Sequence, residues 1–157
     1  GELHLEGVAV LGGNSSNSTA NTIVQGGSIH AVSSNVSISG CRFENNFAEC
    51  HGGGIFANCS VLTVKDSVFR GNKAGFQSFA GNDNVEGAGG GIACENTRLS
   101  INSSLFDDNY ASKKGGGVDA GRGNVSVVDS IFFNNLAGSD NVESEEALGE
   151  GAAFSFT

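Results

Sequence analysis

Glycine clusters recur along this chain, and the first four are each followed at fixed distances by the same kinds of residue. The clusters begin at Gly26, Gly52, Gly89, Gly115 and Gly149. Aliphatic residues stand ten positions after the first glycine of the first four clusters: Val36, Leu62, Leu99 and Val125. Phenylalanines stand seventeen positions after it, and asparagines follow three positions later: Phe43, Phe69, Phe106 and Phe132, then Asn46, Asn72, Asn109 and Asn135. A period held this closely indicates a repeat architecture.

The repeat is about 26 residues long, which is the distance from Phe43 to Phe69 and from Phe106 to Phe132. Longer copies carry their extra residues at one phase, after the asparagine and before the next glycine cluster, at 73–88 and 136–148. An N-terminal copy starts at Leu3 and has its own insertion at 14–20. Because insertions at one phase predict loops on one edge of a stack, we expect a single domain over residues 1–157.

Within each repeat, apolar and polar residues alternate, which is typical of half-buried strands. Leu62-Thr63-Val64 shows this pattern; a second strand is expected at the phenylalanine and a third at the glycine cluster. Bend residues separate the first two strands: Gly7, Gly40, Asp66, Ser103 and Asp129. Glycine makes up 25 of the 157 residues, which disfavours helices. We therefore predict an all-β solenoid, a right-handed parallel β-helix of about five rungs with three short strands per rung.

The repeated phenylalanines and asparagines have a structural explanation in such a coil. Phe43, Phe69, Phe106 and Phe132 would stack inside the column about one strand spacing, 4.8 Å, apart. Asn46, Asn72, Asn109 and Asn135 would form a ladder of side-chain amides at a turn, each donating to one neighbour and accepting from the other. We predict that these residues stabilise the fold and have no catalytic role.

The same two motifs resemble the repeats of the chlamydial polymorphic outer-membrane proteins. Phe-x-x-Asn occurs at Phe43, Phe69, Phe106 and Phe132, and Gly-Gly-x-Ile or its Val variant ends at Ile55, Ile92 and Val118. The resemblance runs from about Gly26 to Phe156. It implies a right-handed β-helix of the pectin-lyase-like class, secreted to the cell surface and acting in adhesion. Since no translocating barrel segment is visible, the resemblance implies at most a passenger fragment of an autotransporter-like protein.

Charge and hydropathy limit the classes of partner. The net charge of −9 disfavours nucleic acid. No apolar run reaches the roughly 18 residues that a membrane span needs. We expect an extracellular or cell-surface protein without a cofactor.

Six Asn-x-Ser/Thr sequons form a second pattern. They begin at Asn14, Asn17, Asn35, Asn58, Asn102 and Asn124, and each asparagine is expected to face solvent. The sequence therefore predicts an N-glycoprotein, most easily from a eukaryotic secretory pathway. The alternative is that an Asn- and Ser-rich β-helix produces sequons by composition alone.

The four cysteines fit an oxidising compartment without requiring one. Cys59 and Cys94 should lie on neighbouring rungs near the same corner, which favours a disulfide between them. A bond between Cys41 and Cys50 is a weaker expectation, because Cys41 occupies the position of Ser67 and could be a free buried thiol. The histidines His4, His30 and His51 form no zinc-ligand pattern with these cysteines, so we expect no metal.

A polysaccharide lyase or hydrolase is the enzymatic alternative, because such β-helices use clustered carboxylates and basic residues. Asp66 and Asp129 share a bend position two rungs apart, and Asp107-Asp108 lies within a turn. The basic residues are scattered, and no aromatic sugar platform accompanies the carboxylates. We expect solvated turn carboxylates and no catalysis.

The two ends and the long insertions carry the functional hypothesis. Neither Leu3-His4-Leu5 nor the segment 152–156 resembles a cap, so we expect either part of a longer solenoid or copies that stack head to tail into a filament. An adhesin should place its binding chemistry in the insertions, with Phe76 and Phe79 as candidate exposed anchors. The alternative is that both side chains fold back over the column.

Overall fold

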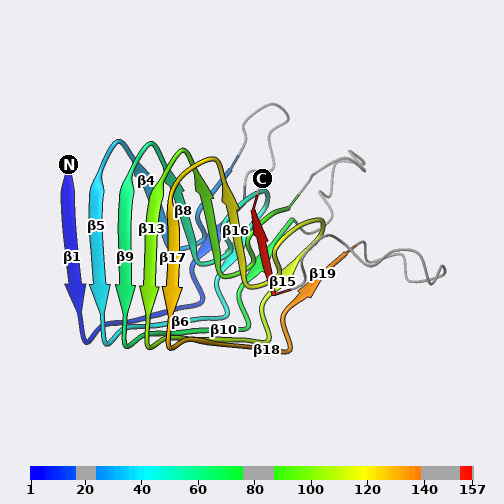
Figure 1. The fold of residues 1–157 in the computed structure, drawn as a ribbon. Helices are drawn as coiled ribbons and strands as arrows, with labels where there is room; N and C mark the ends of the chain where they lie inside the picture. The colour runs from blue at the N-terminus through cyan, green and yellow to red at the C-terminus, as the bar shows by residue number, and fades with distance from the viewer. Residues whose placement is uncertain (17–23, 76–86, 139–152, 157) are drawn as a thin grey trace.

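The structure, a computed structural model, describes residues 1–16, 24–75, 87–138 and 153–156. These residues form four parallel sheets, each of five strands, and each of five rungs contributes one strand to every sheet (Figure 1). This arrangement confirms the right-handed parallel β-helix. The described part of the chain has no helix that is long and apolar enough to cross a membrane.

Sheets A and B contain the first two strands of every rung. Sheet A consists of β1 (Glu2–Glu6), β5 (Asn35–Ser39), β9 (Val61–Lys65), β13 (Arg98–Asn102) and β17 (Val125–Val128). Sheet B consists of β2 (Ala9–Leu11), β6 (Arg42–Glu44), β10 (Val68–Arg70), β14 (Leu105–Asp107) and β18 (Ile131–Phe133). The strands of sheet A stand side by side in sequence order of the rungs in Figure 1, from blue β1 to yellow β17.

Sheets C and D complete each rung. The rungs are numbered 1 to 5 in chain order, so that rung 1 consists of β1 to β4 and rung 5 of β17 to β20. Sheet C consists of β3 (Asn14–Ser15), β7 (Phe47–Ala48), β11 (Lys73–Ala74), β15 (Tyr110–Ala111) and β19 (Leu136–Ala137). Sheet D consists of β4 (Ile29–Val32), β8 (Ile55–Asn58), β12 (Ile92–Glu95), β16 (Val118–Gly121) and β20 (Phe154–Phe156).

Each rung has four strands, whereas the sequence predicted three. The additional strand is that of sheet C, and it is only two residues long, too short for an alternating pattern to be visible. For the same reason, the expected insertions begin too early, because 14–15, 73–74 and 136–137 are regular strand. Ala88, the last residue of the second expected insertion, is also regular, since it bridges His51 and Lys114 on the neighbouring rungs.

The register of the sheets follows the sequence repeat. Leu3 pairs with Val36 and Val10 pairs with Phe43, which confirms the N-terminal copy. Phe69 pairs with both Phe43 and Phe106, although the second interval contains an insertion. Equivalent positions of successive rungs therefore form rows that run along the axis of the coil.

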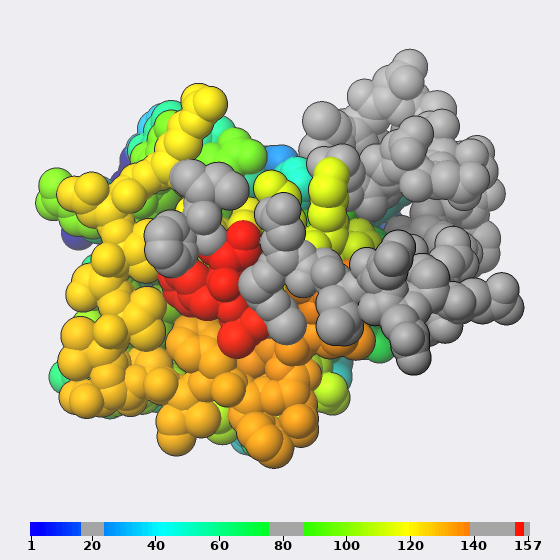
Figure 2. All heavy atoms as spheres, turned by 45° about the vertical axis from the view of Figure 1, so that its right-hand side comes forward, coloured from blue at the N-terminus to red at the C-terminus, as the bar shows by residue number. Residues whose placement is uncertain are grey.

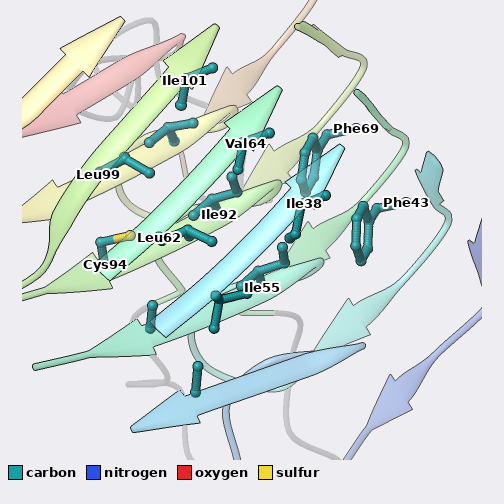
Figure 3. Close-up of a cluster of buried hydrophobic side chains, with 14 of the residues drawn as sticks. Ile38, Phe43, Ile55, Leu62, Val64, Phe69, Ile92, Cys94, Leu99 and Ile101 are labelled. Carbon is teal, nitrogen blue, oxygen red and sulfur yellow. The ribbon is translucent and has the colours of Figure 1, made fainter. Parts of the chain in front are cut away.

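Apolar residues fill the inside of the coil, as Figure 3 shows. On sheet A the inward residues Leu62, Val64, Leu99 and Ile101 are almost completely buried. The rings of Phe43, Phe69, Phe106 and Phe132 stack with neighbouring centroids 4.8 Å apart and planes within 7° of parallel. The predicted row of inward aromatic rings is present, with Val10 in its first position.

The asparagine ladder lies at the corner between sheets B and C. The Nδ2 of Asn72 donates to Oδ1 of Asn109 at 2.9 Å and to the carbonyl oxygen of Phe43 at 2.9 Å. Its Oδ1 accepts from both the backbone N–H and the Nδ2 of Asn46, at 3.1 and 2.8 Å. The amide thus uses its two donors and both acceptor positions inside the column, as the ladder requires.

Two further ladders at other corners were not predicted from the sequence. Between sheets A and B, the backbone N–H of Ser67 donates to Oγ of Ser104, and that of Ser104 donates to Oγ of Ser130. Between sheets D and A, the N–H of Ser34 donates to Oγ of Ser60, whose own N–H donates to Oγ1 of Thr97. The sequence feature that could have predicted both ladders is a serine or threonine at the same position of successive repeats.

The bends and glycine clusters meet two different backbone requirements. The predicted bend residues all have positive φ, from 47° at Ser103 to 63° at Gly7. In the clusters, Gly52 has a φ of 69°, and a Cβ on Gly53 would collide with the carbonyl oxygens of Gly90 and Lys73. The first glycine is needed for its conformation and the second for close approach of neighbouring rungs.

Candidate functional site

Three of the six sequon asparagines are exposed on the surface of the coil. Asn14 lies on β3, Asn35 on the outer face of sheet A, and Asn124 just before β17. Asn35 also lines a shallow polar groove of about 550 Å³ that crosses three rungs at the corner between sheets D and A. These three side chains are accessible, as expected for glycan attachment.

The other sequon asparagines are less accessible or lie outside the described residues. Asn58 is half-buried, and its Oδ1 is buried without a hydrogen-bond partner. Asn102 is half-buried, and its Nδ2 donates to Oγ of Ser100 at 3.2 Å. Asn17 lies outside the described residues. Asn58 and Asn102 therefore occupy outward strand positions, as expected, but their side chains are only partly accessible.

All four cysteines are free, so neither of the expected disulfides is formed. Cys94 points into the core beside Ala57, whereas Cys59 stands exposed at the next corner with a φ of 49°. Cys41 is buried in the row of Ser67, and its Sγ contacts the carbonyl oxygen of Ser39 at 3.2 Å. Burial raises the pKa of the Cys94 thiol, and the nearby Asp119 raises it further.

The acidic residues considered for catalysis lie at exposed corners or in ion pairs. Asp66 and Asp129 are exposed at the bend between sheets A and B, with Ser103 on the rung between them. Two strand spacings, about 10 Å, separate such positions. The Asp107 carboxylate pairs with Arg70 at 2.9 Å. The described residues include no group of three His, Cys, Asp or Glu side chains that could hold a metal ion.

The outer face of sheet D has an unusual row of residues. His30, Phe56, Ala93, Asp119 and Ser155 occupy equivalent positions on successive rungs. Phe56 is nearly completely buried although it points away from the core, and the His30 ring packs edge-on against it at 5.2 Å. His51, Ala88 and Lys114 form a second, parallel row before the glycine corner.

Asp119 is an ionisable group in the first of these rows, and its surroundings shift its pKa. Its Oδ1 is buried without a hydrogen-bond partner. Burial raises the pKa of Asp119; a hydrogen bond from Ser155 and the charges of Lys114 and His51 oppose this, while Glu95 adds to it. Sequence reasoning missed this residue, because its neighbours Ala93 and Ser155 are distant in sequence.

The segment 76–86, one of the expected binding loops, has described residues at both of its ends, and Ala88 follows it in the row beside sheet D. Gly75 and Gly87 flank the segment 76–86, and a Cβ on Gly75 would collide with Gly87, so the two ends of the segment lie against each other. Phe76 and Phe79 lie outside the described residues.

The rung 5 end of the column exposes the inside of the coil. Figure 2 shows this end, with β17 in yellow, β18 and β19 in orange, and β20 in red. A hollow of about 520 Å³ opens here, lined by Ala120, Arg122, Gly123, Val125, Val127, Phe132 and Phe154. Phe154, on sheet D, packs edge-on against Phe132 of sheet B at 5.9 Å.

Four outward side chains of rung 5 are also apolar. Val128, Ile131, Phe133 and Leu136 are all exposed. In the preceding rungs, the row of Val128 contains Asn102 and Lys65, and the row of Phe133 contains Asp107 and Arg70. The signal in the sequence is confined to the rows of Val128 and Phe133, where the last repeat is apolar and the second to fourth repeats carry polar or charged residues.

The comparisons with known proteins identify one segment. No curated protein sequence and no solved structure matches the chain. Residues 40–58 match the model of the Chlamydia polymorphic membrane protein repeat. The matched segment covers most of rung 2, from the Gly40 bend through Phe43, Asn46 and the glycine cluster to Asn58. The family is one of outer-membrane surface proteins, which suggests a cell-surface location. The chain is therefore a right-handed parallel β-helix that carries a repeat of the Chlamydia polymorphic membrane protein type in its second rung.

Proposed function

We propose that this chain is a secreted, non-catalytic β-helix module that serves structure and adhesion at a cell surface, in the manner of a passenger domain. The surface-protein repeat at residues 40–58 supports the location. The observation that carries the proposal is the placement of the extra length, because the segments 17–23, 76–86 and 139–152 all fall between sheet C and sheet D of their rungs. A rigid column with loops at one edge is a suitable scaffold for binding.

The adhesive role is tested by restoring a regular rung at the insertion 76–86 of rung 3. In rung 4 the two residues Ser112-Lys113 join Ala111 to Lys114, and the equivalent link in rung 3 runs from Gly75 to Gly87. A variant in which Ser-Lys replaces residues 75–87 should keep its circular dichroism spectrum and melting temperature. Beads coated with it should lose attachment to cultured epithelial cells.

Two controls separate loop sequence from loop length. A variant with residues 76–86 scrambled keeps length and composition, and Phe76→Ser with Phe79→Ser removes only the candidate anchors. We expect both to bind as weakly as the shortened variant. Undiminished attachment of the shortened variant would contradict a role for this loop.

We also propose that the exposed sequons carry N-glycans when the chain passes through a eukaryotic secretory pathway. Asn14, Asn35 and Asn124 should be occupied, because their side chains are exposed. Intact mass before and after glycosidase treatment measures occupancy, and Asn35→Gln should remove one glycan. A single unmodified mass would contradict the proposal.

End-to-end stacking into a filament is a second candidate function, favoured by the apolar rung 5 end. Inward and outward apolar side chains are exposed there, and among the described residues β17, β18 and β19 are each paired on one side. Electron microscopy of the concentrated chain should show filaments of one column width. Monodisperse particles at every concentration would contradict stacking.

Polysaccharide cleavage is the remaining alternative. A non-catalytic module should release no reducing ends from polygalacturonate. An activity that Asp66→Asn abolishes would establish an enzyme instead.

A further inference from the structure

We infer that the partner of the rung 5 end is the rung 1 end of a second copy, docked head to tail so that Phe133 of one copy lies beside Leu11 of the next. The inference rests on the proposed end-to-end stacking and adds its polarity and register. The row of outward residues on sheet B carries it.

That row is apolar only at its two ends. Its members, from rung 1 to rung 5, are Leu11, Glu44, Arg70, Asp107 and Phe133. The three middle residues form ion pairs, Arg70 with Asp107 and Glu44 with Arg42. Leu11 is 61% exposed and Phe133 is 60% exposed. In a head-to-tail stack these two residues become neighbours in one row, and each covers the other.

The inward rows at the two ends are also complementary. Val125 and Val127 are 37% and 40% exposed, whereas Leu99 and Ile101, one rung below, are 1% and 0% exposed. Leu3 and Leu5 occupy the same two rows at rung 1. Placing rung 1 on rung 5 would therefore repeat the packing already present between neighbouring rungs and would bury the residues that line the hollow.

The sizes of two residues favour this polarity. In the phenylalanine row, rung 1 has the smaller Val10. In the row of Ile55, Ile92 and Val118, rung 5 has the larger Phe154, whose ring lies edge-on to Phe132. A rung with valine in place of phenylalanine leaves room for that ring. Two rung 5 ends facing each other would instead bring two Phe154 rings together with no small residue in the phenylalanine row.

Strand direction and charge support the same polarity. Every strand pair in the described residues is parallel, and a head-to-tail stack continues parallel pairing from β17 to β1. A contact between two rung 1 ends would bring the exposed Glu2 and Glu6 of one β1 near those of another. Like charges on facing edge strands oppose such pairing.

Cysteine cross-linking of the full chain tests both polarity and register. In a Cys59→Ser background, which removes the exposed thiol, Leu11→Cys and Phe133→Cys are made as separate proteins. Neighbouring positions on paired strands bring Cα atoms within the roughly 4.4–6.8 Å range that a disulfide requires. After mild oxidation, the mixture of the two proteins should give about tenfold more disulfide dimer than either alone, because docking raises the local thiol concentration.

The protein carrying both substitutions should give a ladder of dimers, trimers and longer products on a non-reducing gel. Leu11 and Phe133 of one copy are four strands apart, about 19 Å, so they cannot bond to each other. Arg70→Cys mixed with Leu11→Cys is the matched control, because it lies in the same row in the middle of the column. It should give no dimer above background.

The remaining outcomes separate this inference from the proposed function. Dimer from Phe133→Cys alone would show a contact between two rung 5 ends, and would overturn the polarity while leaving stacking intact. Dimer from Leu11→Cys alone would overturn it in the same way. If no combination cross-links and sedimentation velocity shows only monomer at high concentration, both the inference and the stacking proposal fail.

Discussion

The rings of Phe43 and Phe69 lie 4.8 Å apart with only 7° between their planes. That distance is the spacing of neighbouring strands, so the backbone ladder sets the ring geometry. Side chains in a row contact mainly the rung above and the rung below. The stability of the column is therefore close to a sum of rung-to-rung terms.

The phenylalanine row should contribute most in the middle of the column. Phe69→Ala removes a fully buried ring stacked on both sides, and we expect a loss of about 3–5 kcal/mol in the free energy of unfolding. Phe132→Ala is the matched control in the same row, and it should cost less because Phe132 is only half-buried. Denaturant unfolding measures both, and equal losses would contradict the rung-by-rung account.

Asn72→Ala should destabilise the fold through the groups it leaves behind. The substitution removes the side-chain partner of the backbone N–H and the Nδ2 of Asn46 and of the carbonyl oxygen of Phe43. The Oδ1 of Asn109 keeps the hydrogen bond from the backbone N–H of residue 72. Unsatisfied buried groups cost about 1–3 kcal/mol each, so we expect a total of order 3 kcal/mol. The exposed Asn35→Ala should change stability by less than about 0.5 kcal/mol. A stable Asn72→Ala protein that had lost adhesion would point to a functional role instead.

The sequence predicted those features of the fold that recur at every rung. Phe69, Asn72 and the Asp66 bend were placed correctly, because each belongs to a row in which equivalent residues repeat. Repetition averages out the weak local preference of any single residue, and this is why a 26-residue period defined the register across insertions.

Features that occur once, or in very short elements, could not be predicted in this way. The two-residue strand Phe47–Ala48 is too short to show a period, so the fourth strand of each rung was missed. Cys94 was expected in a disulfide, but one position along a strand changes a side chain from the outside to the core. Burial of Asp119 depends on Ser155, which follows a long insertion, and no local pattern reports that neighbour.

The four thiols should differ strongly in reactivity. Cys59 is exposed and should react with a thiol reagent in the folded protein at the rate of an unhindered cysteine. Cys94 is buried and its thiol pKa is raised by burial, so it should react only after denaturant is added. Mass spectrometry of native and unfolded samples, each labelled without reduction, identifies the sites. Native protection of Cys59, reversed by reduction, would reveal a disulfide.

Asp119 gives the fold a carboxyl group whose ionisation opposes folding. Because burial raises its folded-state pKa above the ordinary value of 3.8, the folded chain holds the proton more tightly than the unfolded chain. Asp119 therefore destabilises the folded state least when its carboxyl group is protonated. Its unfavourable contribution develops as the pH rises from 3.8 through the folded-state pKa, and is complete above that pKa.

Asp119→Asn should therefore raise the melting temperature at neutral pH. The amide keeps an oxygen that can accept the hydrogen bond from Ser155, and it removes a charge that is poorly solvated on the outer face of sheet D. The difference from the wild-type melting temperature should shrink as the pH falls and should be lost well below pH 3.8, where the carboxyl is protonated in both states. Asp129→Asn, at an exposed corner, is the control and should show no such trend. If Asp119→Asn instead lowered the melting temperature at neutral pH, the attraction of Lys114 and His51 would outweigh the cost of burial.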